Sequence, residues 1–164
     1  MQDEILQNGL NSYQQILLWH IPLFLTFLFS IFDYIFVIAL KSIISNLISI
    51  LPSLIGFLIA SLTILISMDN KMLNKQVKGV DSKDKISYRQ VGASIFMYTT
   101  KIALVLIILS FIMPMQIPEL LISMKVIILF LTKLFIFLLF SKLLVMIFYG
   151  LLFLSSAIAP VKIK

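Results

Sequence analysis

Asp33 is an acidic residue inside a long apolar stretch that runs from Ile21 to Leu40. A carboxylate is costly in lipid, where it marks a specific partner or a function. Other apolar stretches contain lysines, with Lys133 near the middle of the last stretch and Lys101 in the third. Counting residues along each stretch places Asp33 and Lys133 at the most similar depth. The sequence therefore predicts an ion pair between the first and the fourth helix.

This ion pair has three alternatives. The carboxyl group of Asp33 can be protonated. It can instead bond to a neighbouring hydroxyl group, of Thr26, Ser30 or Tyr34. A proton or ion relay is the third alternative, although one acid without a second is a poor relay. Lys101 is expected to extend its side chain towards the headgroups on the cytoplasmic side.

The composition indicates the class of protein that holds these charges. Of the 164 residues, 61% are hydrophobic and 12% are charged. The apolar runs reach the roughly 20 residues that cross a hydrocarbon core of about 30 Å. The chain has no cysteine and one histidine, which excludes disulfides and leaves too few ligands for a zinc site. We expect an all-α integral membrane protein with one domain over residues 1–164.

The apolar stretches predict four transmembrane helices, because backbone groups in lipid must bond within their own segment. The expected spans are residues 21–40, 47–66, 94–113 and 120–149. No turn signal divides the last stretch, so we expect one long, tilted helix there. Residues 1–20 have apolar side chains at helical spacing, which predicts an amphipathic helix at the membrane surface; a frayed polar leader is the alternative. Trp19 and His20 would then lie at headgroup level.

The distribution of charge predicts the orientation. Residues 68–93 form the long polar connection between the second and third spans, whereas the other two loops are short. The positive-inside rule places this loop and both termini in the cytoplasm. Tyrosine and arginine are favoured at interfaces, so the loop predicts contacts with a cytoplasmic partner or with membrane lipids. The residues concerned are Lys71, Lys75, Lys78, Lys83, Lys85, Tyr88 and Arg89. A solvated face near anionic lipid is the other interpretation.

Small residues follow one face of the second span at steps of four, three, four, three and four. They are Ser49, Ser53, Gly56, Ala60, Thr63 and Ser67. These steps match the spacing of left-handed helix pairs, and small residues let helix backbones approach closely in lipid. We expect a contact surface, either within the four-helix unit or between subunits. A pore lining and chance are the alternatives.

The layout of the whole chain resembles small four-span membrane proteins of bacterial anti-phage defence loci, in particular the membrane subunit of the Kiwa system. The likeness includes the block from Gly56 to Ala60 and the basic loop that begins at Ser67 and reaches Lys71. It implies a homo-oligomer, with a tetramer favoured, in the inner membrane. The cytoplasmic side would hold a soluble effector that acts on phage DNA, and no catalytic residue is implied.

The residues predict no enzyme, because they include no Gly-rich phosphate loop and no Ser-His-Asp set. We expect no catalytic, cofactor-binding or metal-binding residue and no direct contact with nucleic acid. The first expectation for function is a scaffold or sensor that forms homo-oligomers and recruits a soluble cytoplasmic effector. The second is a pore or ion channel, either a membrane-depolarising effector or a holin-like protein. The third is a small transporter, for which Pro52 is only one possible helix break.

Overall fold

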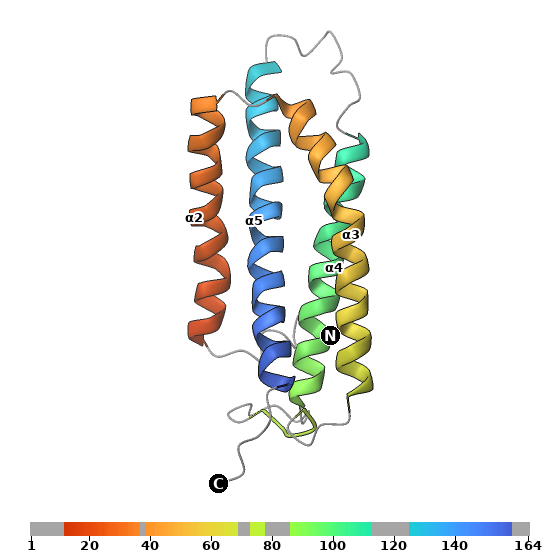
Figure 1. Ribbon diagram of the computed structural model, residues 1–164. Coiled ribbons are helices and arrows are strands. Elements are labelled where there is room, and N and C mark those ends of the chain that lie inside the picture. The colour runs from red at the N-terminus through yellow and green to blue at the C-terminus, as the bar shows by residue number, and fades with distance from the viewer. Residues whose placement is uncertain (1–11, 37–38, 69–72, 78–85, 113–124, 159–164) are drawn as a thin grey trace.

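The computed structural model describes residues 12–36, 39–68, 73–77, 86–112 and 125–158. These residues form long helices and one isolated β-bridge (Figure 1). The helices are α2 (Ser12–Phe36), α3 (Leu40–Ser67), α4 (Tyr88–Ile112) and α5 (Lys125–Ile158). In the described part of the chain, all four are long and apolar enough to cross a membrane. The predicted all-α class with four membrane-spanning helices is therefore confirmed.

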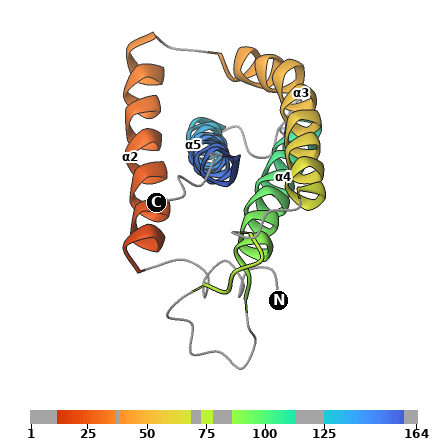
Figure 2. The same ribbon diagram turned by 60° about the horizontal axis from the view of Figure 1, so that its bottom comes forward.

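The helices lie side by side, with α5 between α2 and the α3–α4 pair (Figures 1 and 2). Helix α2 packs mainly against α5, while α4 packs against both α3 and α5. Ser67, Tyr88 and Ile158 lie at the same end of the bundle, the lower end in Figure 1, which we call the loop end. The first and last helices of the described residues, α2 and α5, are therefore neighbours.

The starts of three helices differ from the predicted spans, and α5 continues to Ile158, past the predicted end at residue 149. Helix α2 begins at Ser12, so the second half of the predicted surface helix continues into the first span; residues 1–11 lie outside the described residues. Helix α3 begins at Leu40, so the turn expected before residue 47 is wrong. Ile43 and Ile44 pack in the bundle there, and this burial extends the helix past its polar residues. The predicted end of the loop at residue 93 is wrong, because α4 begins at Tyr88.

A capping box explains the early start of α4. The backbone N–H of Ser87 donates to Gln90 Oε1 at 2.8 Å, and the backbone N–H of Gln90 donates to Ser87 Oγ at 3.3 Å. These reciprocal bonds satisfy amide groups that a helix N-terminus otherwise leaves unpaired. Ser87 also forms the β-bridge with Gln76, which draws the two described pieces of the connection together. Leu73 and Ile86 are both buried beneath them.

Helices α3 and α4 pack through two complementary lines of side chains. The buried line on α3 is mostly leucine: Ile44, Leu47, Leu51, Leu58, Ser61 and Leu65. The buried line on α4 is rich in small residues, at steps of four, three, four, three and four: Gly92, Phe96, Thr99, Ala103, Leu106 and Ser110. Large side chains on one helix thus meet small ones on the other at heptad spacing, as in left-handed helix pairs.

Two glycines let α4 and α5 approach each other closely. A Cβ atom on Gly92 would lie 2.8 Å from Leu65 Cδ2 and closer still to the ring of Phe153. A Cβ atom on Gly150 would lie 3.1 Å from Cε1 of Phe96. Each helix therefore places a phenylalanine ring over a glycine of the other helix. A larger residue at Gly92 would displace the ring of Phe153 and the side chain of Leu65.

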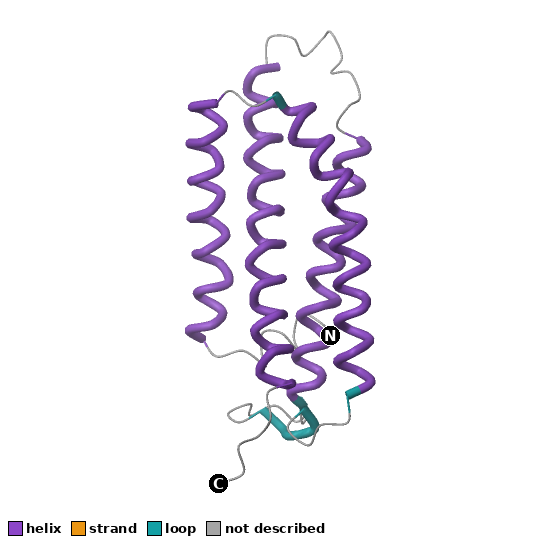
Figure 3. The backbone as a smooth tube through the Cα atoms, viewed as in Figure 1, coloured by secondary structure: helices purple, strands orange, loops and turns teal. Residues whose placement is uncertain are grey.

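Helix α3 changes direction along its length and remains one helix. Its first part inclines towards α5, and the remainder runs beside α4 (Figure 3). Pro52 lies inside α3 and cannot donate the backbone hydrogen bond to the carbonyl group of Ile48, which accounts for a bend of this kind. Helix α5 likewise continues without a break through Gly150. Its 34 residues give it a length of about 51 Å, in agreement with the long fourth helix expected from the sequence.

Candidate functional site

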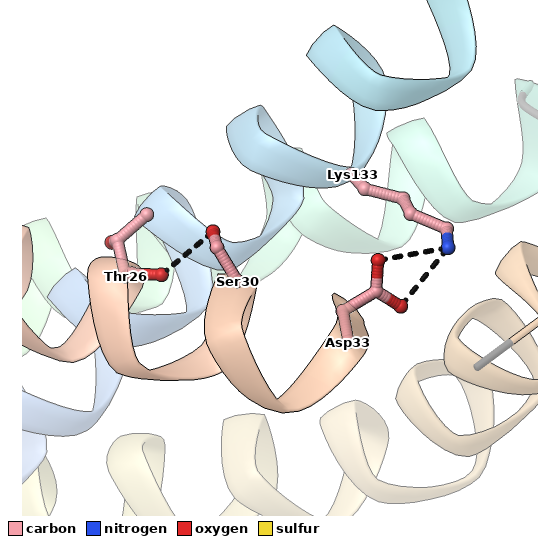
Figure 4. A network of polar contacts seen from close by, with 4 residues as sticks. All are labelled: Thr26, Ser30, Asp33 and Lys133. Atoms are coloured by element: carbon pink, nitrogen blue, oxygen red, sulfur yellow. Dashed lines mark hydrogen bonds and ion pairs between the residues drawn. The ribbon is translucent and has the colours of Figure 1, made fainter. Parts of the chain in front are cut away.

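The main polar contact between α2 and α5 is the ion pair of Asp33 with Lys133. Lys133 Nζ lies 2.9 Å from each carboxylate oxygen of Asp33 (Figure 4). The two side chains are only 19% and 16% exposed. As the sequence predicts, Lys133 is the partner of Asp33. Because the ammonium group contacts both oxygens, the geometry supports attachment of α2 to α5.

Two of the three hydroxyl groups proposed as alternative partners of Asp33 bond elsewhere. Ser30 Oγ donates to the carbonyl oxygen of Thr26 at 2.9 Å (Figure 4). Thr26 Oγ1 donates to the carbonyl oxygen of Pro22 at 2.7 Å and lies 3.3 Å from Ser141 Oγ of α5. Thr26 and Ser141 are both buried, so they form a second polar contact between the helices. Tyr34, the third proposed partner, is 86% exposed.

Aromatic side chains complete the contact between α2 and α5. The ring of Phe29 lies 5.9 Å from that of Phe137 and 6.2 Å from that of Phe140, measured between centroids. Nearer the loop end, Lys142 Nζ lies 4.2 Å from the centroid of the Trp19 ring. The interface thus alternates polar and aromatic levels. In lipid, such contacts matter because acyl chains are as apolar as leucine side chains. Burial of apolar side chains alone therefore gives no preference for contact with another helix.

The small-residue face of α3 points away from the bundle. All six predicted residues are exposed: Ser49, Ser53, Gly56, Ala60, Thr63 and Ser67. A Cβ atom on Gly56 would have nothing within 4 Å. The expectation of a contact within the four-helix unit is therefore wrong, since α3 uses its leucine line to pack against α4. The prediction of a contact between subunits is not affected by this finding.

The predicted partner-binding residues of the loop divide into three groups. Lys75 and Tyr88 are exposed at the loop end. Lys71, Lys78, Lys83 and Lys85 lie outside the described residues. Arg89 instead bonds within the chain: its guanidinium group donates to the carbonyl oxygens of Met68 and Ile66. These carbonyls lie at the C-terminus of α3, where a positive charge is favourable, so Arg89 has a capping role. Contact of Arg89 with a partner stays a prediction.

We expect Arg89→Gln to lower the free energy of unfolding by about 1 kcal/mol, because the end of α3 loses a charged hydrogen-bond donor. The measurement is a denaturant titration of the purified protein in detergent micelles. Lys75→Gln is the matched control, since Lys75 is exposed on the same connection and its removal should leave stability unchanged. An equal decrease in the free energy of unfolding in both variants would contradict the capping role.

Three contact residues were not predicted from the sequence: Lys142, Gly92 and Gly150. The signal for Gly92 was present, because the small residues of the third span also recur at heptad spacing. The contact of Lys142 with Trp19 had no comparable signal, since the two residues lie on helices far apart in the chain.

The chain matches no protein-family model, no curated protein and no solved structure. Within the ranges that the structure describes, no three histidine, aspartate or glutamate side chains come close enough to hold a metal ion. The function is therefore argued from the helix contacts and the exposed faces.

Proposed function

We propose that this chain is a multi-pass scaffold or sensor subunit of the bacterial inner membrane, with both termini in the cytoplasm. In this proposal it forms homo-oligomers, with a tetramer favoured, through the outward face of α3. It recruits a soluble cytoplasmic effector at the loop end, in the manner of the anti-phage proteins that it resembles. The observation that carries the proposal is the line of exposed small residues along most of the length of α3.

The polar groups on this face of α3 favour a protein neighbour over a water-filled lumen. Ser49 Oγ donates to the carbonyl oxygen of Asn46, and Thr63 Oγ1 donates to that of Ile59. Hydroxyl groups satisfied by their own helix need no water. The open space at Gly56 admits the backbone of a second helix, which is the arrangement that small residues promote in lipid.

The loop end supports the effector part of the proposal. Helix α5 is about 51 Å long, whereas a hydrocarbon core is about 30 Å thick. Towards the loop end this helix leaves Phe148, Leu152 and Ile158 exposed. If this length projects beyond the lipid, such side chains require cover from a protein surface. Lys75 and Tyr88 lie exposed at the same end and supply polar and aromatic contacts.

The test of self-association is cross-linking in native membranes. Gly56→Leu and Ala60→Leu place bulky side chains on the outward face of α3, and each should reduce the cross-linked oligomer about tenfold by preventing close helix approach. Ser155→Leu is the control, because it adds the same side chain at an exposed position of α5. Unchanged cross-linking in both α3 variants would contradict an oligomer contact on this face.

The test of recruitment is co-purification with any soluble protein that an adjacent gene encodes. Binding should be lost in the variant Lys75→Glu/Tyr88→Ala and retained in the wild-type chain. Conductance of vesicles that contain this protein alone is the outcome expected of the pore alternative, and it would contradict a scaffold that acts only through its partner.

A further inference from the structure

Lys142 carries a charge for which the described chain provides no anion. The residue is half-buried and lies near the middle of α5. Its Nζ atom lies 4.2 Å from the ring centroid of Trp19 and 5.3 Å from that of Tyr98. Within the described ranges the only carboxylate residue is Asp33, and Lys133 contacts both of its oxygens. Aromatic faces attract an ammonium group but do not neutralise it.

Neighbours of Tyr98 on α4 and of Trp19 on α2 also favour the boundary between lipid and water. Lys101 is exposed and follows Tyr98 by one turn of α4. His20 is exposed and follows Trp19, whose ring is 63% exposed. Tryptophan and tyrosine concentrate at headgroup level in membrane proteins, and lysine side chains extend towards it. Three helices thus bring interfacial side chains together around one ammonium group.

The length of α5 agrees with a membrane boundary at Lys142. From Lys142 back to Lys125, at the end opposite the loop end, the helix rises about 26 Å. This length is close to the hydrocarbon core of about 30 Å. A headgroup phosphate in the leaflet nearer the loop end would then lie within reach of the Lys142 side chain, because lysine extends towards the headgroups.

We propose that Lys142 and Lys101 bind the phosphate group of an anionic phospholipid, with Trp19 and Tyr98 packing beside its headgroup. The phosphate supplies the anion that the described chain lacks. The exposed ring of Trp19 leaves the site open to lipid. The lysines come from α4 and α5 and the tryptophan from α2, so the bound lipid joins three helices at the point where α2 and α5 meet.

The single tryptophan of the chain reports on this site directly. The full-length protein is reconstituted in phosphatidylcholine vesicles in which a fraction of the lipid is brominated, either phosphatidylglycerol or phosphatidylcholine. Bromine quenches the fluorescence of Trp19 in proportion to local lipid occupancy. We expect brominated phosphatidylglycerol to associate about fivefold more strongly than brominated phosphatidylcholine for each lysine that contacts it. The variant Lys142→Gln/Lys101→Gln should reduce the ratio of association, phosphatidylglycerol over phosphatidylcholine, to about one. The variant Lys142→Arg should preserve this ratio.

Two controls separate the alternatives. Lys75→Gln removes a charge from the exposed loop end and should leave the ratio unchanged. Inorganic phosphate added to phosphatidylcholine vesicles should leave Trp19 emission unchanged; a change as large as the one caused by phosphatidylglycerol would assign the site to free phosphate. Equal quenching by the two brominated lipids in the wild-type protein would overturn the proposal without reference to any variant. So would an unchanged ratio in the double glutamine variant.

Discussion

The variant Lys133→Met is expected to lose about 2–3 kcal/mol of stability, because it leaves the carboxylate of Asp33 without its partner in an apolar region. Asp33→Asn should also destabilise the protein, since the ammonium group of Lys133 loses the carboxylate that it contacts. The double variant Asp33→Asn/Lys133→Met removes both charges and should recover most of the loss. The measurement is the free energy of unfolding, obtained by detergent titration of each variant in mixed micelles.

The double-mutant cycle isolates the contribution of the pair from that of each side chain. Additive losses, with the double variant as unstable as the sum of the singles, would show that the two side chains do not act together. Tyr34→Phe is the matched control on α2, because Tyr34 is adjacent to Asp33 and 86% exposed. We expect its unfolding free energy to equal that of the wild-type protein.

Gly92→Val is expected to destabilise the helix bundle by about 1–3 kcal/mol or more, the usual range for an overpacked core. Its Cβ atom alone would overlap the ring of Phe153 and approach Leu65, which is completely buried. Gly92→Ala should give a smaller loss, because one methyl group can be accommodated by rotation of the ring. Thermal unfolding in detergent, followed by circular dichroism, measures both effects.

Gly56→Ala provides the comparison, because a Cβ atom there has nothing within 4 Å. Its stability as a monomer in detergent should not fall, since alanine also favours the helix over glycine. In the Gly92→Ala background, Phe153→Leu should restore part of the loss by removing the ring that the new methyl group meets. Equal stability of Gly92→Val and the wild-type protein would show that α4 and α5 are not closely packed at this point.

The hydrophobic runs predicted the helices well, because the length of an apolar segment decides whether it can cross lipid. The Asp33–Lys133 pair was also predictable, since counting residues places both side chains at one depth. The positions at which the helices begin were not predictable from the apolar runs. Packing of Ile43 and Ile44 extends α3 through polar residues to Leu40. The Ser87–Gln90 capping box starts α4 at Tyr88, before the predicted span. Packing and capping at these positions depend on neighbours that apolar composition does not identify.

The faces of α3 show a different limit. Its small residues and its buried leucines both recur at heptad spacing, on opposite sides of the helix. Periodicity identifies a face but not the neighbour that covers it. The sequence therefore predicted a contact surface at Gly56 without showing that α4 packs against the other side. For Arg89 the limit is similar, because the backbone carbonyls that it caps carry no sequence signal.

The order of the described helices along the chain affects how this protein is inserted, because α5 is synthesised after α2, α3 and α4. Asp33 and Lys133 are separated by 100 residues, so Asp33 enters the membrane long before its partner is synthesised. At about 5–20 residues per second, the delay is about 5–20 s. The α3–α4 hairpin can form during that time, but α2 has to remain beside the insertion machinery or in lipid with its carboxyl group unpaired. Translation of α5 is therefore the step that lets α2 join the rest of the bundle.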